Sequence, residues 1–183
     1  MEANQKRAQF VLEVDPLDHP LGLVEKQKAH RQGILHRAFS IFVFRSQGPS
    51  LQLLLQKRAA EKYHSGGLWT NTCCGHAQEL ISLETAAKSR LVEEMGISCE
   101  LYPAGSFYYL AKLDNEMIEH EIDHVFIATA NPTAIRPNPL EVQDYQWQDV
   151  ALLLEMSEEA KASFTVWFFP AFEVAVKCVG DRL

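Results

Sequence analysis

One amphipathic helix between runs of strand-like sequence is the feature that most constrains how this chain can fold. From Ser82 to Met95, apolar residues recur at every fourth position and so line one face of a helix, at Leu83, Ala87, Leu91 and Met95. Glu84 in the first turn and Gly96 after the last one are typical of the two ends of a helix. The spacing therefore predicts a helix over residues 82–95 with a single apolar stripe.

Short apolar segments on both sides of this helix predict β-strands. Six segments have strand length: Phe10–Val14, Ala38–Phe44, Leu51–Gln56, Leu101–Leu113, Ile118–Ala130 and Glu141–Trp147. The second and third are separated by the turn-forming residues 46–50, so we expect them to pair as a hairpin. A second turn near residues 114–115 joins the fourth segment to the fifth.

Two further helices are expected near the C-terminus. Residues 150–160 fit one helix, and residues 164–179 fit another that should begin near Pro170, because proline is tolerated only in a first turn. A β-hairpin, a helix, antiparallel strands and two helices, in that order, are the pattern of an α+β sandwich. The 183 residues contain no repeat and no linker-like stretch, so we expect a single domain over residues 1–183.

The net charge and the cysteine spacing indicate which binding partners and which cellular compartment to expect. The net charge is −7, whereas nucleic acids and anionic membranes bind basic surfaces, so we expect neither as a partner. The four cysteines, at positions 73, 74, 99 and 178, form no Cys-x-x-Cys pair and do not suggest a disulfide framework. No segment resembles a signal peptide or reaches membrane-spanning length, and the expected location is the cytoplasm.

Histidines and glutamates near predicted strand ends form the first candidate site. Side chains alternate along a strand, so Glu119 and Glu121 should face the same side of the fifth predicted strand. With His30, His36 and His76 they could supply three imidazoles and two carboxylates to an ion of Mn, Fe, Zn or Mg. The remaining histidines have no comparable neighbours: His19, His64, His120 and His124. A solvated edge strand and separate hydrogen-bonded histidines are the alternative interpretation.

A thiol is the second candidate. Cys74 directly precedes Gly75 and His76, and a cation near that histidine would lower the pKa of the thiol into a useful range. A small buried hydrophobic residue is the alternative for any free cysteine. Because side chains alternate, the neighbouring Cys73 should point the opposite way. The aromatic residues Tyr109 and Trp167 can likewise be explained by packing alone.

Basic residues offer a third candidate, an anion site. Lys57, Arg58 and Lys62 form a dense cluster, and residues 26–31 form another. Either could clamp an anion, although such runs more often form a solvated face. Arg90 and Glu94 lie four positions apart on the predicted helix and could simply pair with each other.

Taken together, these blocks closely resemble the type I isopentenyl-diphosphate isomerases, a branch of the Nudix fold. The similarity runs from about Gly22 to Ala175 and is carried by residues 26–30, 36–40, 67–76, 93–96, 119–121, 144–147 and 167. The pattern Trp-Thr-Asn-x-x-Cys-Gly-His over 69–76, followed by Glu-x-Glu at 119–121, is strongly specific. The resemblance implies a Nudix-type α/β/α sandwich with a mixed, largely antiparallel sheet.

The sequence departs from the signature of Nudix hydrolases. Aligned from Gly75, that signature requires Glu at position 81 and Arg-Glu at positions 89 and 90, where this chain has Ile81, Ser89 and Arg90. Only Glu93 and Glu94 remain of its four carboxylates. The departure favours an isomerase over a hydrolase, because the hydrolytic metal cluster would be incomplete.

The resemblance also implies a reaction and its catalytic residues. Isopentenyl diphosphate and dimethylallyl diphosphate would be interconverted by a 1,3-proton transfer through a tertiary carbocation-like species, feeding isoprenoid biosynthesis. Cys74 and Glu121 would flank the carbon chain, and Tyr109 would assist Glu121. Trp167 would stabilise the cation with its ring, a contact worth roughly 2 kcal/mol when desolvated.

Two metal ions and a small-molecule diphosphate are implied as cofactors and substrate. One divalent ion (Mn²⁺, Mg²⁺ or Zn²⁺) would be held by His30, His36, His76, Glu119 and Glu121. A Mg²⁺ on the diphosphate would reach Glu94. The diphosphate itself would contact Lys26, Arg58, Lys62 and Arg90, with Lys57 as a weaker candidate. A monomer or weak homodimer is expected.

Two other hypotheses fit parts of the sequence. A Nudix-type diphosphate hydrolase with an atypical metal cluster is suggested by Glu93 and Glu94. A binding module that is stabilised by metal and has no turnover is suggested by the histidines and carboxylates, because these also serve as structural ligands.

Overall fold

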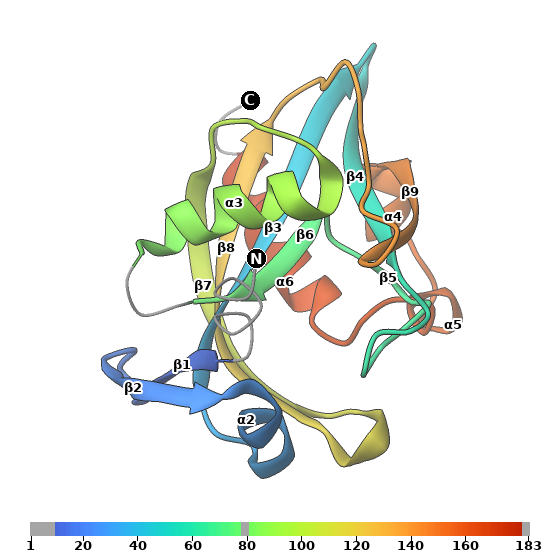
Figure 1. Ribbon diagram of the computed structural model, residues 1–183. Helices are drawn as coiled ribbons and strands as arrows, with labels where there is room; N and C mark the ends of the chain where they lie inside the picture. The colour runs from blue at the N-terminus through green and yellow to red at the C-terminus, as the bar shows by residue number, and fades with distance from the viewer. Residues whose placement is uncertain (1–9, 78–80, 181–183) are drawn as a thin grey trace.

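Strand β3 (His36–Gln47) organises the computed structural model, which describes residues 10–77 and 81–180. One edge of β3 pairs in parallel with β8 (Ile118–Thr129), from His36 opposite Glu121 to Phe44 opposite Thr129. Its other partners are antiparallel: β1 (Phe10–Val14) at its start, β6 (Cys73–His76) along its middle and β4 (Ser50–Arg58) at its end. β3 therefore joins strands from the whole length of the chain (Figure 1).

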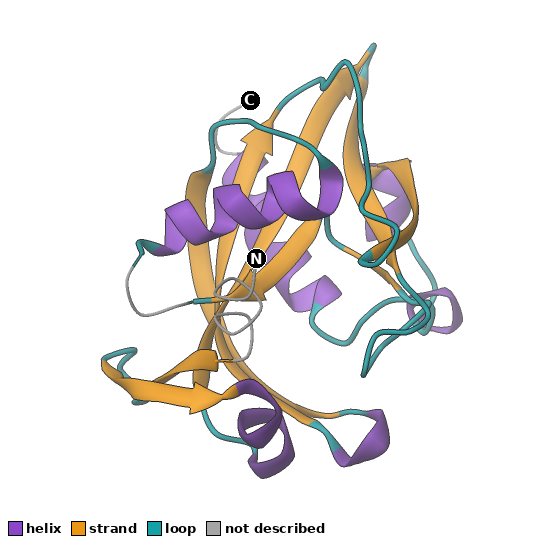
Figure 2. Ribbon diagram, in the orientation of Figure 1, coloured by secondary structure: helices purple, strands orange, loops and turns teal. Residues whose placement is uncertain are grey.

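The other strands extend this sheet outward. β2 (Pro20–Glu25) pairs with β1, and β7 (Tyr102–Lys112) pairs with β8. β5 (Trp69–Thr70) and β9 (Val142–Asp149) both pair with β4. Within the described residues the sheet has nine strands, and only the β3–β8 pair is parallel. The sheet is thus mixed and largely antiparallel, as expected (Figure 2).

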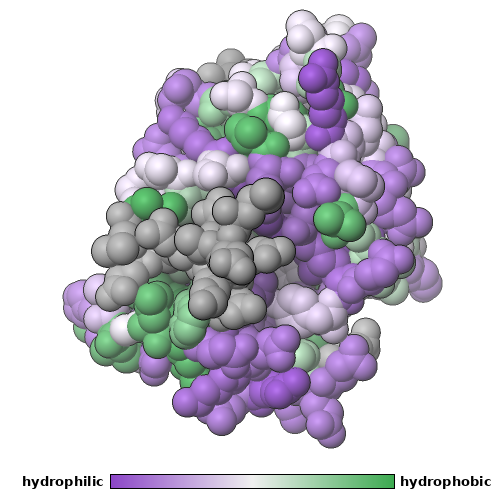
Figure 3. Space-filling model, in the orientation of Figure 1, coloured by the Kyte–Doolittle hydropathy of each residue, from purple (hydrophilic) through white to green (hydrophobic). Residues whose placement is uncertain are grey.

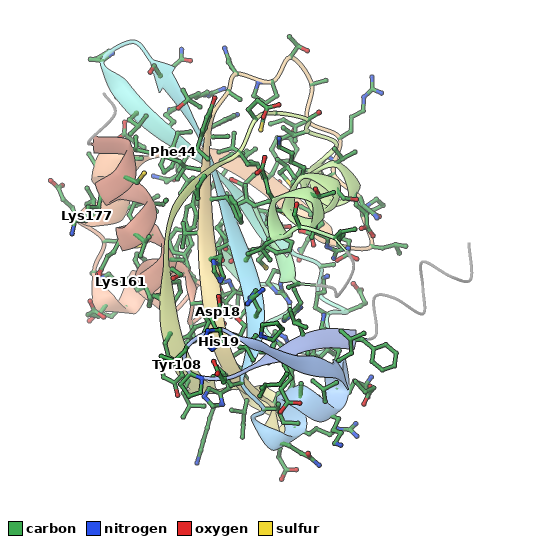
Figure 4. The ribbon with its side chains drawn as sticks, turned by 90° about the vertical axis from the view of Figure 1, so that its left-hand side faces the viewer. Asp18, His19, Phe44, Tyr108, Lys161 and Lys177 are labelled. Atoms are coloured by element: carbon green, nitrogen blue, oxygen red, sulfur yellow. The ribbon has the colours of Figure 1, made fainter. Side chains whose placement is uncertain are left out.

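Two long helices cover opposite faces of the sheet. α3 (Leu83–Met95) lies on one side and α6 (Phe168–Gly180) on the other, and Figure 4 shows the sheet edge-on between them. The remaining helical segments are short: α2 (Lys26–Gln32), η1 (Asp114–Glu116), α4 (Val150–Leu154) and α5 (Glu158–Lys161). The layers form the α/β/α sandwich that the family resemblance implies.

Successive side chains of β3 point to opposite faces of the sheet, so the strand contributes to both hydrophobic cores. Ile41 and Val43 face α3 and pack with its stripe, whose buried members are Ala87, Leu91 and Met95. Phe42 and Phe44 face α6, where they join Phe168 and Phe172, and Figure 4 shows Phe44 beside that helix. The strand is buried on both faces, which explains its nearly continuous apolar sequence.

The helix limits confirm the capping signals in the sequence. The Ser82 side chain accepts a hydrogen bond from the Thr85 amide at the start of α3. Gly96 ends the helix in a left-handed conformation (φ 66°). Pro170 lies in the first turn of α6, also as expected.

The expected helix over residues 150–160 is wrong as a single element. It is two short helices, because Glu155 ends α4 and Ser157 caps the start of α5 by accepting from the Ala160 amide. β2 and α2 had no counterpart among the expected elements. α2 is bounded by the Glu25 side chain, which accepts from two backbone amides, and by Gly33 in a left-handed conformation (φ 62°).

The surface seen in Figure 3 is mostly hydrophilic, with hydrophobic residues gathered in patches. One patch lies over the β1–β2 hairpin, where Leu21 and Leu23 are exposed. None of the helices within residues 10–77 and 81–180 has the length and apolar character that a bilayer crossing requires.

Replacing Phe168 by alanine should destabilise the protein strongly. Its ring is fully buried and stacks on Phe172 at 5.5 Å between centroids, so truncation leaves a cavity where α6 meets the sheet. We expect the free energy of unfolding in urea to fall by about 3–5 kcal/mol. The control Leu152→Ala, on an exposed position of α4, should change it by only about 0.5 kcal/mol. Equal losses in the two variants would contradict this account of the core.

Candidate active site

A cleft with a volume of about 560 Å³ opens beside the start of β3. Residues from β3, β6, β8, α3 and the β4–β5 loop line it, and so does Trp167, immediately before α6. His36 is on the same face of β3 as Phe42 and Phe44, by alternation. The cleft therefore includes side chains from that face, such as Ser40, and side chains from the α3 side, such as Phe39 and Glu94.

Strand register brings the predicted metal ligands together. His36 is opposite Glu121 in the β3–β8 pair, and Ala38, two residues along β3, is opposite His76 in the β3–β6 pair. Each of the five predicted residues offers one ligand atom, and these atoms lie within 4.8 Å of one another: His30, His36, His76, Glu119 and Glu121. His30 reaches the group from α2. The structure therefore brings these five side chains together, in an arrangement that suggests a metal site.

Backbone hydrogen bonds orient two of the imidazoles. His30 Nδ1 lies 2.7 Å from the Lys26 carbonyl, and His36 Nδ1 lies 2.8 Å from the Ile34 carbonyl. A carbonyl only accepts, so each Nδ1 carries a hydrogen, and Nε2 is the ring atom that has the lone pair when the imidazole is neutral. His30 Nε2, His36 Nε2 and Glu119 Oε2 are buried without a hydrogen-bond partner. Buried polar atoms are rarely left unpaired, and these three converge, so the donor set fits a divalent cation.

The Glu121 carboxylate stands at the centre of this group. Its Oε1 is 2.9 Å from His76 Nε2 and 3.2 Å from His36 Nε2, and its Oε2 accepts a hydrogen bond from the Tyr109 hydroxyl at 2.5 Å. Burial alone would raise the pKa of Glu121, but His36 and Tyr109 outweigh it and lower that pKa. Burial would lower the pKa of His36, but the contact with Glu121 raises it. Glu121 is therefore a carboxylate at neutral pH.

Cys74 faces the cleft from β6, while Cys73 points into the hydrophobic core on the α3 side. Alternation along the strand predicts this difference. Desolvation raises the pKa of the Cys74 thiol to about 12, although the Arg58 guanidinium, 3.8 Å from the sulfur, acts in the opposite direction. Desolvation thus outweighs the guanidinium, and Cys74 is a neutral thiol at pH 7.

Three buried polar residues, Thr70, Asn71 and Thr72, hold the Cys74 strand in place. The Thr72 hydroxyl donates to the Leu54 carbonyl at 2.6 Å and accepts from the Val43 amide at 2.9 Å, so it links β4 to β3. The Asn71 amide donates to the Cys73 carbonyl at 2.6 Å. The Trp-Thr-Asn block of the sequence is therefore a structural clamp beside the thiol.

Arg58 and Trp167 form one wall of the cleft. The Arg58 guanidinium lies 5.3 Å from the centre of the Trp167 ring and donates to the carbonyl of Ser65 at 3.2 Å. Trp167 is 4% exposed, and its Nε1 has no hydrogen-bond partner among the described residues. Both residues line the cleft, as do the predicted anion-binding residues Lys26, Lys62 and Arg90. Lys57, the weaker candidate, is not among the lining residues and instead lies 5.9 Å from the Trp69 ring.

Arg90 and Glu94 do pair, and they belong to a larger network. Arg90 Nη2 is 2.6 Å from Glu94 and 2.8 Å from Glu141, which also binds Lys62. Glu94 accepts a further hydrogen bond from Gln56 at 2.9 Å and is 4% exposed. Burial lowers the pKa of Lys26, and the charges of Lys62 and Arg90 lower it further. Arg90, Glu94, Glu141 and Lys62 thus form one ionic network in the cleft.

Sequence reasoning missed several residues of the cleft, among them His64, Glu141 and Asp123. His64 is buried, 3.2 Å from Glu119, so the expectation that it lacks relevant neighbours is wrong. No sequence signal identifies it, because a loop carries it into place. Glu141 was noted only as a strand start. Asp123, 2% exposed and hydrogen-bonded to Ser40 at 2.7 Å, shares the strand face of Glu119 and Glu121, so the same alternation could have identified it.

Comparisons with known proteins identify the fold and the family. The NUDIX domain family matches residues 34–168. The isopentenyl-diphosphate Delta-isomerase of Burkholderia multivorans is 49% identical over 162 residues, which cover 88% of this chain and 90% of that protein. Isopentenyl-diphosphate Delta-isomerase 2 of Photorhabdus laumondii is 51% identical over 155 residues, covering 85% of each. Among solved structures, DR0079 from Deinococcus radiodurans has a TM-score of 0.69 at 19% identity and covers 92% of this chain and 98% of its own, a likeness of fold.

Metal binding at the five-residue cluster should depend on pH. The raised pKa of His36 means that the metal-free protein keeps a proton there at higher pH than free imidazole, and a metal must displace that proton. We expect the affinity for Mn²⁺ to rise with pH through and above about 6.5, the ordinary pKa of an imidazole, because the raised pKa of His36 delays loss of its proton. Titration of chelator-treated protein at several pH values measures this. In His36→Ala the affinity should be weaker at every pH, and a flat profile in the wild type would contradict the expectation.

Proposed function

The chain belongs to the isopentenyl-diphosphate Delta-isomerases of the NUDIX fold, and we propose that its cleft catalyses their 1,3-proton transfer with Cys74 and Glu121 as the proton-transferring pair. The reaction interconverts isopentenyl diphosphate and dimethylallyl diphosphate. The observation that carries the assignment of residues is that a neutral thiol and a carboxylate line the same cleft.

The reaction requires one proton donor and one proton acceptor. The alkene of isopentenyl diphosphate carries no activating group, so protonation of its terminal carbon must produce a tertiary cation-like centre. Removal of a proton from the carbon on the other side of that centre then forms the new double bond. A thiol with a pKa near 12 holds its proton at pH 7, whereas Glu121 is ionised. Cys74 is thus the donor in this state and Glu121 the acceptor.

Tyr109 and Trp167 assist this pair. The Tyr109 hydroxyl, which is bonded to Glu121, holds that carboxylate in position and offers a route for its proton. The Trp167 ring would face the cationic carbon, a contact worth roughly 2 kcal/mol when desolvated. Enzymatic rate enhancements start near about 8 kcal/mol, so the acid and the base must provide most of the effect.

The five-residue cluster would hold one divalent ion. When bound, such an ion fixes the Glu121 carboxylate and tunes its basicity. His30 and His36 present Nε2 toward it because backbone carbonyls hold their Nδ1 hydrogens. Mn²⁺, Mg²⁺ and Zn²⁺ all suit imidazole and carboxylate ligands to some degree, and metal analysis of the purified protein distinguishes them.

The diphosphate would bind at the other end of the cleft, near Glu94 and the four cations Lys26, Arg58, Lys62 and Arg90. Arg90 and Lys62 are already paired with Glu141, so they are held beside each other before an anion arrives. Glu94 would ligate a Mg²⁺ that accompanies the diphosphate, because a buried carboxylate is a hard oxygen ligand. We further propose a cytoplasmic enzyme that is a monomer or weak homodimer, which sedimentation analysis tests.

A hydrolase is the weaker candidate. Two carboxylates of the hydrolase signature are replaced by Ile81 and Arg90, and only Glu93 and Glu94 remain, which leaves the hydrolytic metal cluster incomplete. Incubation with nucleoside diphosphate derivatives should release no phosphate or nucleotide. The same preparation should isomerise isopentenyl diphosphate, and this activity also separates an enzyme from a binding module without turnover.

Replacing Cys74 by alanine should abolish isomerisation. We expect a loss of about 10²–10⁴-fold in kcat, the usual contribution of a positioned acid or base. The measurement is NMR of isopentenyl diphosphate in D₂O with Mg²⁺, where wild type should give deuterated dimethylallyl diphosphate. Cys178→Ala, a free cysteine on α6 outside the cleft, is the matched control and should retain activity. Full activity in Cys74→Ala would remove the thiol from the mechanism.

Replacing Glu94 by glutamine should change the Mg²⁺ requirement. The amide is a poorer ligand than the carboxylate, so we expect half-maximal activity to need about tenfold more Mg²⁺. Mn²⁺ binding at the five-residue cluster, which Glu94 does not join, should be unchanged. Glu84→Gln, an exposed position of the same helix, provides the control. An unaltered Mg²⁺ dependence in Glu94→Gln would exclude Glu94 as a ligand.

A further inference from the structure

His64 lies beside the proposed metal centre without belonging to its five ligands. It is 5% exposed, and its Nε2 is 3.2 Å from Oε1 of Glu119. The other oxygen of the same carboxylate, Oε2, is 3.3 Å from His30 Nε2, and it is the one that is buried without a hydrogen-bond partner. The two oxygens of Glu119 therefore have different neighbours: one has His64, and the other has the ligand cluster.

The second ring nitrogen of His64 determines which atom carries the hydrogen. His64 Nδ1 is hydrogen-bonded to the hydroxyl of Ser65 at 3.2 Å. When that hydroxyl donates, Nδ1 is the acceptor and Nε2 of a neutral imidazole carries the hydrogen toward Glu119. Ser65 is thereby able to select the tautomer in which His64 is a donor to the carboxylate.

The loop between β4 and β5 holds the imidazole in this place. Arg58 donates to the carbonyls of His64 and Ser65, at 3.4 and 3.2 Å. Ser65 has a left-handed backbone (φ 51°), and a Cβ on the following Gly66 would lie 2.4 Å from the Ala60 carbonyl oxygen. A non-glycine residue in this conformation is uncommon, so the tight loop is shaped to turn the His64 ring inward.

Ring contacts connect His64 to both halves of the site. It stacks on His30 with 5.7 Å between centroids, and it meets Trp167 edge-on at 6.0 Å. The imidazole thus fills the space between the ligand cluster and the ring proposed to face the carbocation.

We propose that His64 is a positioning residue of the metal centre, which holds Oε1 of Glu119 so that Oε2 is presented to the ion. This inference rests on the proposed function, because it assumes that the five-residue cluster binds a divalent cation. Groups that orient a ligating carboxylate commonly change metal affinity by about 10–100-fold when they are removed. His64→Leu should therefore weaken Mn²⁺ binding by about that factor.

Mn²⁺ titration of chelator-treated, full-length protein, followed by electron paramagnetic resonance, is the test. His64→Gln places an amide N–H near the position of Nε2 and should restore the affinity to within about threefold of wild type, as expected when only the donor matters. His64→Asn, whose amide reaches only the position of Nδ1, should behave like His64→Leu. His124→Gln is the control, since His124 bonds Asp18 at 2.9 Å and neither residue lines the cleft.

The outcomes separate this inference from the function on which it rests. If the wild-type protein does not bind one Mn²⁺ per chain, the proposal of a metal centre is itself overturned. If wild type binds Mn²⁺ and all three His64 variants bind it equally well, the metal centre stands and the role of His64 is overturned. A loss that His64→Gln does not restore, with all variants unfolding cooperatively near the wild-type temperature, also overturns the donor role and leaves packing as the explanation.

Discussion

The register of β3 is the constraint on which the rest of this molecule depends. The same strand pairs with β8 on one edge and β6 on the other, so a single alignment sets His36 beside Glu121 and Ala38 beside His76. A slip of one residue would turn every side chain of β3 to the opposite face. It would remove His36 from the cleft and Phe42 from the α6 core together, and so the packing energy of the core also enforces the geometry of the site.

Burial of polar atoms in the cluster costs the folded protein free energy. A buried polar atom without a hydrogen bond costs about 1–3 kcal/mol, and three lie together here: His30 Nε2 and Glu119 Oε2, which are 3.3 Å apart, and His36 Nε2, which is 3.2 Å from Glu121. The structure tolerates them because the surroundings are rigid: Thr72 links β3 to β4, and backbone carbonyls fix two imidazoles. A cation that met all three would recover this cost, so that binding and stability are coupled.

Periodicity made part of this structure predictable. The apolar stripe of α3 and the alternation that turns Cys74 and Cys73 apart follow from local geometry, and both are confirmed. The prediction of the five-residue cluster also required the family resemblance, because spacing alone left a solvated strand as an alternative. His64 could not be found, since its position depends on a loop whose shape no short pattern encodes. The split of residues 150–160 was missed because Ser157 was not recognised as a helix cap.

Cys74 keeps its proton and Glu121 loses its proton because different charged and hydrogen-bonding groups lie next to them. The cations Arg58, 3.8 Å from the sulfur, and Lys62 lower the pKa of Cys74 by less than desolvation raises it, so the sulfur keeps its proton. Glu121 is as deeply buried, but it has two imidazoles and the Tyr109 hydroxyl within 3.2 Å, and those contacts favour its charge. The proposed reaction adds a proton to one carbon of the substrate and removes a proton from another. It therefore needs one protonated and one ionised group, because two neutral acids would offer no acceptor and two anions no donor.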